Sequence, residues 1–358
     1  MTETDRHQVK ESQQGTRHHE VWRARWLPLL LIMGILAAML PNLVEAKPRH
    51  NQGDRARFVE ARDAVSRHRR GGVHGEIVGG TVVPQGTYTF ATFITVDYGE
   101  RRTACTGSLI APQFVLTAGH CVVNKDTGTP ATPAQFSLVI GQSHAFPPPP
   151  AANVFSVAQV FRHPGFAAST AGNDVAVLKL TQAVPASLSR PIALVAANDT
   201  RYEMPGQRVV AAGWGLTVGG GELSPDLRQI STTTISDVAC DDRFSAEIDD
   251  ATVICTQVPS KNICQGDSGG PLFVAPPAGA AAIRHTARAG RGQLHRERKK
   301  KHHHPTPPPP PPPPPVTDPL LIGVTSFSAV GCAPGTASGY AQLSAPSIHD
   351  FVTNALQN

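Results

Sequence analysis

From residue 77 onward the chain alternates short apolar runs with Gly, Pro, Asn and Asp residues. Runs of this kind occupy residues 114–118, 175–180, 208–212 and 320–325. Many short apolar segments separated by turn-forming residues are typical of β-strands in a sandwich or barrel. The pattern therefore predicts an all-β domain for most of the chain.

Only the C-terminus has the spacing of an amphipathic helix. Ser344 and Pro346 supply start signals for a helix, and apolar residues then recur every three or four positions. The residues that share this apolar face are Ile348, Phe351, Val352 and Leu356. The sequence predicts a single C-terminal helix that packs against the β domain.

Residues 275–319 interrupt the strand pattern. They change from Ala/Pro-rich to Arg/Lys/His-rich and include nine consecutive prolines at 307–315. No hydrophobic period is present, and polyproline forms an extended, solvated helix. We expect a disordered insert between two strands. The histidines at 302–304 could bind a metal, but their basic and Pro-rich surroundings favour a solvated loop, so we predict no metal site.

The N-terminus carries an apolar stretch at residues 27–40, after a polar lead. Fourteen residues are short for a membrane span, which needs about 20. Val44 and Ala46 place small residues where signal peptidase cuts, so residues 1–46 are predicted to be a signal peptide. An uncleaved signal anchor is the alternative. The charged residues 47–76 resemble a pro-segment, which leaves 77–358 as the domain.

The net charge of +5 is spread unevenly along the chain. Residues 1–76 carry 13 Lys/Arg against 9 Asp/Glu, and residues 281–315 carry 8 against 1, so the remainder has a net charge of −6. A mildly acidic domain argues against nucleic-acid binding. The six cysteines lie between residues 105 and 332 without metal-type spacing, which favours three disulfides in an oxidising compartment.

Three short segments carry the chemistry of acyl transfer by a serine. Residues 264–271, with the sequence CQGDSGGP, surround Ser268 with glycines whose N–H groups can converge beside its hydroxyl. Residues 117–121 place His120 at the end of an apolar strand, and residues 173–178 place Asp174 at the head of another. A nucleophile, a base and a buried carboxylate are therefore present in one chain.

In the order His120, Asp174, Ser268, these segments resemble the trypsin/chymotrypsin family. The resemblance extends from Ile77 to about residue 357 and includes the segment 213–215, with the sequence GWG. It implies two antiparallel six-stranded β-barrels with the active site between them. It also implies a serine endopeptidase that needs no cofactor and acts on protein or peptide substrates.

The resemblance assigns a role to each residue of this site. Ser268 would attack the substrate carbonyl, His120 would transfer the proton, and Asp174 would orient the imidazole. The N–H groups of Gly266 and Ser268 would bind the oxyanion. Asp267 would pair with the new α-amine of Ile77 after proteolytic activation. The implied disulfides are Cys105–Cys121, Cys240–Cys255 and Cys264–Cys332.

Two departures from trypsin concern specificity and activation. The position at the base of the substrate pocket is Asn262, and the walls correspond to Ser328 and Ser338, so no carboxylate is placed to pair a substrate Arg or Lys. We therefore expect uncharged residues before the scissile bond. Glu76 precedes Ile77 where the family has a basic residue, and the basic residues 67–70 are either a processing site or a solvated part of the pro-segment.

Two alternative hypotheses follow from these features. A catalytically inactive homologue that acts as a binding or inhibitory protein would tolerate the Glu76 junction, although the complete triad argues against it. A membrane-anchored protease would keep the apolar segment 27–40 as an anchor. We predict a secreted zymogen that another protease activates.

Overall fold

The computed structural model describes residues 79–358, except residue 100 and the segments 146–148, 245–247 and 278–315. The chain divides into two units, residues 1–72 and 73–358, and every described residue belongs to the second. The predicted signal peptide and pro-segment, with Ile77, therefore lie outside the described residues. So does the central part of the predicted 275–319 insert. No helix among the described residues is long and apolar enough to cross a membrane.

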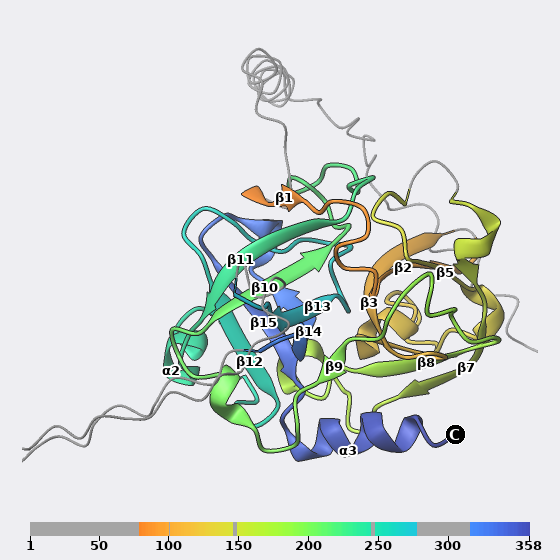
Figure 1. Ribbon diagram of the computed structural model, residues 1–358. Helices are drawn as coiled ribbons and strands as arrows, with labels where there is room; N and C mark the ends of the chain where they lie inside the picture. Colours follow the sequence, from red (N-terminus) through yellow and green to blue (C-terminus); the bar gives the residue numbers. More distant parts are fainter. Residues whose placement is uncertain (1–78, 100, 146–148, 245–247, 278–315) are drawn as a thin grey trace, which may run out of the picture. The chain divides into compact units, whose positions relative to one another are not determined.

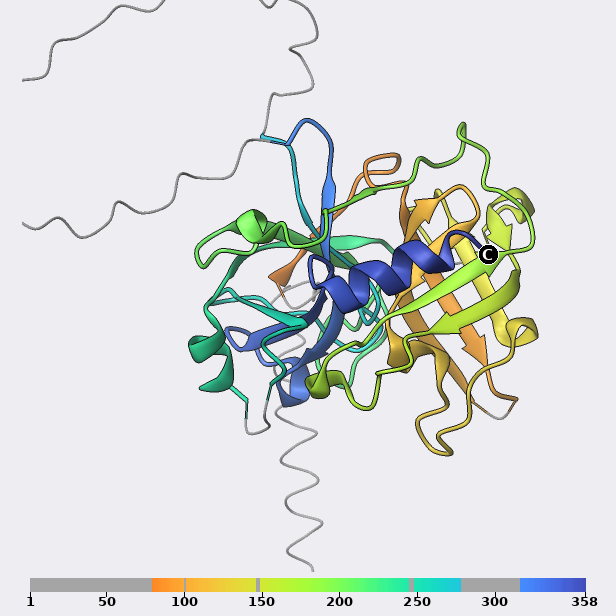
Figure 2. The same ribbon diagram turned by 90° about the horizontal axis from the view of Figure 1, so that it is seen from below.

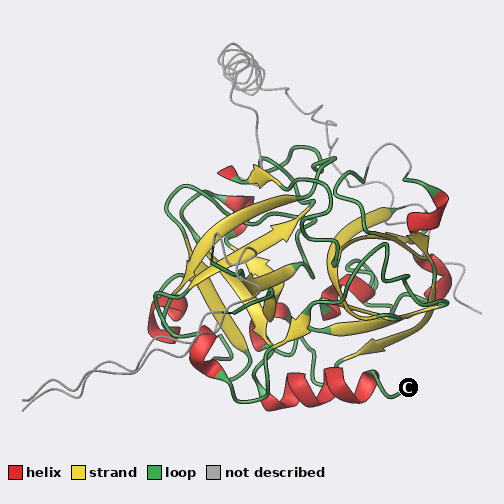
Figure 3. Cartoon of the chain, in the orientation of Figure 1, coloured by secondary structure: helices red, strands yellow, loops and turns green. Residues whose placement is uncertain are grey.

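Strands dominate the described part of the chain (Figures 1 and 3). The first strands in sequence order are β1 (Thr81–Val82), β2 (Ala91–Asp97), β3 (Arg102–Ala111), β4 (Phe114–Thr117), β5 (Phe136–Ile140), β6 (Val154–Phe155), β7 (Val157–Arg162) and β8 (Ala176–Leu180). Those that follow are β9 (Ala193–Leu194), β10 (Arg208–Gly213), β11 (Arg228–Thr234), β12 (Val253–Gln257), β13 (Pro271–Val274), β14 (Leu320–Ser328) and β15 (Ala337–Gln342). Each of the four apolar runs singled out in the sequence overlaps one of these strands, namely β4, β8, β10 or β14.

The N-terminal strands form a seven-stranded antiparallel sheet in the order β6-β5-β2-β3-β4-β8-β7. Its two edge strands, β6 and β7, are not paired within the described residues. They are consecutive in the chain, with only Ser156 between them, so the two edges meet through the backbone and not through a ladder. Because no ladder joins its edges, this sheet is a half-barrel.

The C-terminal strands form a second sheet that closes on itself. The order β11-β10-β13-β14-β15-β12 is completed by pairing of β12 with β11, which gives a closed six-stranded barrel. Strands β1 and β9 add to its outside. The predicted all-β class is confirmed. Of the two six-stranded barrels expected, one is closed with six strands and the other is a seven-stranded half-barrel.

The predicted C-terminal helix is present as α3 (Pro346–Ala355). Ile348 and Val352 are fully buried, and Phe351 and Leu356 are partly buried against the core. Seen from below, α3 leaves the second barrel and runs toward β7 and β8 of the half-barrel (Figure 2). The helix thus ties the two sheets together.

The structure also contains a short helix that the sequence pattern did not predict, α2 (Asp237–Asp241). Ser236 caps it by accepting a hydrogen bond from the backbone N–H of Ala239 at 3.2 Å. Five residues are too few to produce a recognisable helical period. Short 3-10 turns also occur, and the one at Gly119–Val122 carries His120.

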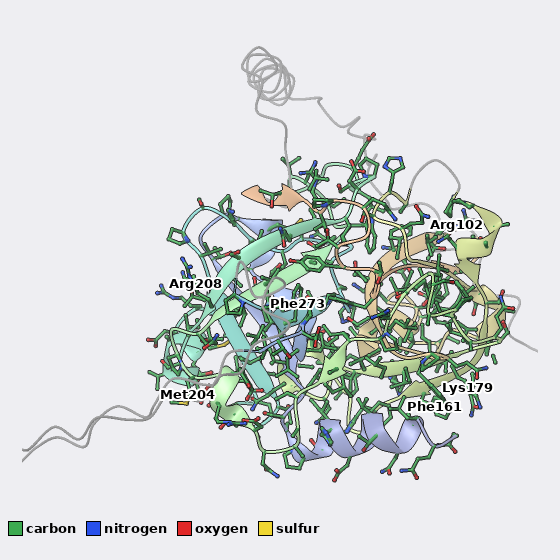
Figure 4. The ribbon with its side chains drawn as sticks, in the orientation of Figure 1. Arg102, Phe161, Lys179, Met204, Arg208 and Phe273 are labelled. Atoms are coloured by element: carbon green, nitrogen blue, oxygen red, sulfur yellow. A yellow bond between two sulfur atoms is a disulfide. The ribbon has the colours of Figure 1, made fainter. Side chains whose placement is uncertain are left out.

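Apolar side chains fill both sheets and the space between them. Phe273 of β13 is fully buried, with its ring 4.9 Å from Tyr88 and 5.6 Å from Phe90. In Figure 4 it lies centrally, whereas Arg102 and Arg208 reach toward the edges. The six cysteines form three disulfides, with the pairings that the family resemblance implies: Cys105–Cys121, Cys240–Cys255 and Cys264–Cys332.

Candidate active site

His120 lies just beyond the end of β4, in the 3-10 turn Gly119–Val122. The buried strand positions the start of this turn, and the Cys105–Cys121 disulfide fastens the residue after His120 to β3. A covalent link at the neighbouring residue leaves the imidazole little freedom to move away. The histidine side chain is 12% exposed, so it is sheltered but still reaches the surface.

Asp174 lies two residues before β8, the neighbour of β4 in the half-barrel. The turn that delivers it includes Asn173 with φ at 54°, a left-handed conformation that asparagine tolerates better than most residues. The hydroxyl of Ser347 in α3 donates a hydrogen bond to the Asn173 side chain at 3.2 Å. The C-terminal helix therefore supports the turn that carries the carboxylate.

His120 and Asp174 make two contacts with each other. Nδ1 of His120 lies 2.7 Å from Oδ2 of Asp174, and the backbone N–H of His120 donates to Oδ1 at 2.9 Å. Ser326 of β14 adds a third hydrogen bond, from its hydroxyl to Oδ2. Both carboxylate oxygens are thus occupied, and the imidazole is held in one orientation.

The contacts of Asp174 also decide its charge. Its side chain is only 1% exposed, and burial alone would raise the pKa of this carboxyl. The charge of His120 and the hydrogen bonds from His120 and Ser326 outweigh burial and hold the pKa below its ordinary value. Because an ionised carboxylate only accepts hydrogen bonds, Nδ1 of His120 carries the proton. In the neutral ring Nε2 is then free to act as a base.

Ser268 lies in the glycine-rich loop before β13. Gly266 has φ at +99° and Gly269 at +81°, conformations that side chains rarely adopt. A Cβ on Gly269 would also lie 2.0 Å from the Thr117 hydroxyl oxygen. Glycine at these positions is what allows the loop to turn sharply against β3 and β4.

Among the described residues, the backbone N–H groups of Gln265, Gly266 and Ser268 in this loop have no acceptor. The N–H groups of Asp267 and Gly269 donate to Cys264 and Thr325, respectively. Those of Gly266 and Ser268 have no acceptor among the described residues. The carbonyl of Gln265 accepts from Leu216 at 2.8 Å, so the N–H on the other side of this trans peptide points away from Leu216. Unused donors beside a serine hydroxyl are what an oxyanion requires.

His120 and Ser268 line one cleft, which has a volume of about 470 Å³. No hydrogen bond joins their side chains among the described residues. Catalytic hydrogen bonds of this type are often long until substrate binds. The other lining residues are Lys125, Phe166, Ala168, Ser169, Ile263, Cys264, Gln265, Thr325, Ser326, Phe327 and Ser328.

Asp267 is buried to the same extent as Asp174, with 1% of its surface exposed. Its carboxylate accepts two backbone hydrogen bonds at 2.8 Å, from the N–H groups of Gly215 and Cys264. Within the described residues no cation approaches it. Burial raises the pKa of Asp267 to about 7, although the two N–H groups oppose the shift.

The three residues predicted to form the substrate pocket occupy two kinds of position. Ser328 lines the cleft, whereas Asn262 and Ser338 are buried and bonded to each other. The Asn262 amide N–H₂ donates to Ala333 and Thr336 at 3.0 and 2.6 Å. Its oxygen accepts from Ser338 and from the backbone N–H of residue 263. The amide therefore has no hydrogen-bonding capacity left for a substrate.

Sequence reasoning missed Ser326 and Thr325, which lie beside the predicted triad in β14. Ser326 donates a hydrogen bond to Asp174, and the buried Thr325 hydroxyl has no hydrogen-bond partner among the described residues although Thr325 lines the cleft. Polar residues inside an otherwise apolar strand were the available signal. That signal could not say which partner they meet.

One cluster has the composition of a metal site, namely Cys105, His120 and Cys121. Both sulfurs are bonded to each other in a disulfide, so neither can act as a thiolate ligand. Only the histidine nitrogen remains, and one ligand does not hold a metal ion. These three residues are therefore close together because the Cys105–Cys121 disulfide lies next to His120, and they do not form a metal site.

Comparison with known proteins places this fold and site in the class of serine endopeptidases. The Trypsin family model matches residues 77–287, more than half of the chain. Relatives include the proclotting enzyme of Tachypleus tridentatus (31% identity over 57% of this chain and 57% of the relative) and trypsin-1 of Astacus astacus (30%, over 55% and 81%). Trypsin of Saccharopolyspora erythraea is 32% identical over 55% of this chain and 82% of the relative. The chain belongs to the trypsin family.

Proposed function

We propose that the chain is the precursor of a secreted serine endopeptidase with His120, Asp174 and Ser268 as its catalytic triad. The observation that carries the proposal is the joint position of a carboxylate-bound His120 and of Ser268 on one cleft. The two unused N–H groups at Gly266 and Ser268 support it, because they would bind the oxyanion.

In the acylation step, Oγ of Ser268 forms a bond to the substrate carbonyl carbon and its proton passes to Nε2 of His120. Negative charge develops on the carbonyl oxygen, where the N–H groups of Gly266 and Ser268 stabilise it. The imidazolium then gives its proton to the leaving amine as the C–N bond breaks. Asp174 stabilises the imidazolium and keeps its own charge.

In the deacylation step, water replaces the departed amine. It gives one proton to Nε2 of His120 and bonds to the acyl carbon of the ester on Ser268. Collapse of the second tetrahedral intermediate breaks the ester C–O bond, and the imidazolium returns the proton to the Ser268 oxygen. Reactants and products balance as peptide plus water giving acid plus amine, with no cofactor.

Activation is proposed to follow cleavage between Glu76 and Ile77 by another protease. Asp267 is a buried carboxylate without a cation among the described residues, and it lies between Gly266 and Ser268 in the chain. An α-amine at Ile77 would supply the missing charge and order the oxyanion donors on either side. Secretion rests on the predicted signal peptide, and a membrane-anchored form is the alternative for the same catalytic domain.

The cleft composition supports a preference for uncharged residues before the scissile bond. None of the described residues that line it is acidic, and Lys125 adds a positive charge. A substrate Arg or Lys would enter without a counter-ion, which is costly. The saturated amide of Asn262 offers it nothing in exchange.

Thr325 gives this preference a polar component. It is 2% exposed and lines the cleft, and its hydroxyl has no partner among the described residues. A buried unpaired hydroxyl costs about 1–3 kcal/mol, which a polar substrate side chain can recover. We expect wild type to favour Asn over the similarly sized Leu, and Thr325→Val to reduce this ratio about tenfold.

The matched control is Thr232→Val. Thr232 is also buried, and its hydroxyl has no partner in the part of the chain that the structure describes, but it lies in β11 and does not line the cleft. Peptide-library profiles of the three proteins measure the Asn-to-Leu ratio. An equal ratio in wild type and Thr325→Val excludes a role for this hydroxyl in specificity.

The catalytic assignment is tested by Ser268→Ala in the activated protein. Peptide hydrolysis should fall by several orders of magnitude, while secretion and the melting temperature stay close to wild type. Comparable turnover by this variant means that another residue is the nucleophile. An activated wild type that neither hydrolyses peptides nor reacts at Ser268 favours the inactive homologue that acts as a binding or inhibitory protein.

A further inference from the structure

Thr106, a residue of the half-barrel, makes two hydrogen bonds to the loop of the closed barrel that carries Ser268, and no sequence motif indicated these contacts. Thr106 lies in β3 and is fully buried. Its hydroxyl donates to the carbonyl of Gly266 at 2.9 Å, and its backbone N–H donates to the carbonyl of Ser268 at 2.8 Å. Both residues whose N–H groups are free for the oxyanion are thus held by Thr106.

The position of Thr106 in β3 makes these contacts possible. Pairing of β3 with β4 begins at Ser108, so Thr106 lies beyond the ladder and its backbone groups are available. Its carbonyl accepts from the hydroxyl of Thr117, three residues before His120. Thr106 therefore links the segment that carries the histidine to the loop that carries the serine.

The contact with Gly266 restrains a residue that has little restraint of its own. Glycine rotates freely about both backbone dihedrals, and Gly266 has φ at +99°. Leu216 holds the carbonyl of residue 265, before Gly266, and Thr106 holds the carbonyl of Gly266 itself. With the peptides on both sides anchored, the direction of the Gly266 N–H is determined.

We propose that Thr106 is a positioning residue of the oxyanion hole, which acts by fixing the backbone of Gly266 and Ser268. This inference rests on the proposed serine protease function. It assigns to Thr106 no contact with substrate. Loss of its hydroxyl should impair the stabilisation of the transition state and leave substrate binding nearly unchanged.

Thr106→Val tests the proposal, because valine keeps the shape and removes the donor. We expect kcat to fall about 10- to 100-fold, less than the 10²- to 10³-fold that follows removal of an oxyanion donor outright. KM for a peptide substrate should change by less than about threefold, since ground-state binding does not need the oxyanion hole. Thr106→Ser keeps the hydroxyl and should recover most of the activity.

Binding of a peptide aldehyde separates positioning from a general loss of structure. The aldehyde forms a hemiacetal whose oxygen needs the oxyanion hole, so its affinity should fall in Thr106→Val by a factor similar to kcat. Affinity for the corresponding peptide alcohol, which has no carbonyl to attack, should stay unchanged. If Thr106→Val does not fold, Thr106→Ala and Thr106→Ser provide the same comparison.

Thr92→Val is the matched control. Thr92 is a fully buried threonine of the adjacent strand β2, and its hydroxyl donates only to the carbonyl of Phe90. It should change the melting temperature but neither kcat nor aldehyde affinity. Wild-type kcat in Thr106→Val, or an equal loss in Thr92→Val, overturns the proposal while the serine protease assignment stands. An activated wild type without hydrolysis or labelling at Ser268 overturns both.

Discussion

The two sides of the cleft differ in how completely their polar groups are used. On the half-barrel side, His120 and Asp174 bond to each other twice, and Ser326 occupies the carboxylate further. On the closed-barrel side, the N–H groups of Gly266 and Ser268 have no acceptor among the described residues, and Asp267 has no cation there. The histidine side is complete in the described chain, whereas the serine side keeps unused groups that a substrate and a new N-terminus would engage.

The pKa directions of the two buried carboxylates express the same difference. Contacts hold the pKa of Asp174 below its ordinary value, while burial raises the pKa of Asp267 to about 7. Equal burial thus gives opposite shifts, and the deciding factor is whether a charged partner is present. An unpaired buried carboxylate is a natural place for an activation step.

The largest loss of kcat is expected from a substitution on the half-barrel side of the cleft, at Asp174. Asp174→Asn keeps the shape but can no longer select the His120 tautomer with a proton on Nδ1. Loss of the Asp in such a triad lowers kcat by about 10⁴-fold, and we expect a similar loss here. Ser326→Ala, which removes only one hydrogen bond to the same carboxylate, is the graded control and should cost far less. Equal kcat values for Asp174→Asn and wild type would contradict the role of Asp174 in orienting His120.

Activation should produce the next largest effect. Replacing residues 72–76 with an enteropeptidase sequence allows a cut that frees the Ile77 amine. Supplying a partner to a buried charge is worth about 3–5 kcal/mol, so kcat/KM should rise about 10²- to 10⁴-fold on cutting. Asp267→Asn should abolish this rise. A precursor as active as the cut protein would show that the serine side is already complete.

The pH dependence of stability sharpens the contrast further. The folded pKa of Asp267 lies above its unfolded value, so the folded state binds more protons between about pH 4 and 7. Unfolding free energy of the precursor should therefore fall as pH rises through this range, by about 2–4 kcal/mol. In the cut protein the Ile77 amine should remove most of this decline. Denaturant titrations at pH 4, 5.5 and 7 measure both.

Glu203 must be separated from this effect, because burial raises its pKa to about 7 as well. Glu203→Gln keeps the hydrogen-bonding shape and removes its titration. The difference between precursor and cut protein should persist in this variant. Its disappearance would assign the pH dependence to Glu203.

A smaller change is expected at the pocket. Asn262→Asp introduces a carboxylate near the cleft and should shift the Arg-to-Leu preference toward Arg by about tenfold. The shift should be incomplete, because the change also removes the donors to Ala333 and Thr336. Asn153→Asp, a buried asparagine of the half-barrel, controls for general destabilisation. A wild type that cleaves chiefly after Arg or Lys contradicts the pocket assignment.

The smallest effect is expected from deletion of residues 281–315. Val274 and Leu320 are cross-strand partners of β13 and β14, so the insert joins two adjacent strand ends. A short hairpin loop can replace it, and melting temperature and peptide hydrolysis should stay nearly unchanged. A large loss of either would show that the insert supports the serine side.

The sequence predicted those features that depend on contiguous residues. The strand pattern, the C-terminal helix and the three segments around His120, Asp174 and Ser268 are short-range signals. The contacts of Thr106 and Ser326 with the site join residues more than 150 positions apart, and no local pattern carries them. The hydrogen bonds that saturate the Asn262 amide could not be predicted for the same reason, because most of its partners are distant in the sequence. The half-barrel depends on the break between β6 and β7 at Ser156, and the spacing of apolar residues does not predict this break.

Reaction of the full-length chain with a fluorophosphonate, before and after the cut at Ile77, is the most direct test of Ser268 as the nucleophile. We predict a single labelled peptide that contains Ser268, with labelling that increases strongly after the cut. The label should be absent in Ser268→Ala and greatly reduced in His120→Ala. No label after verified release of Ile77, or a label on another serine, would contradict the assignment of this cleft as a serine protease active site.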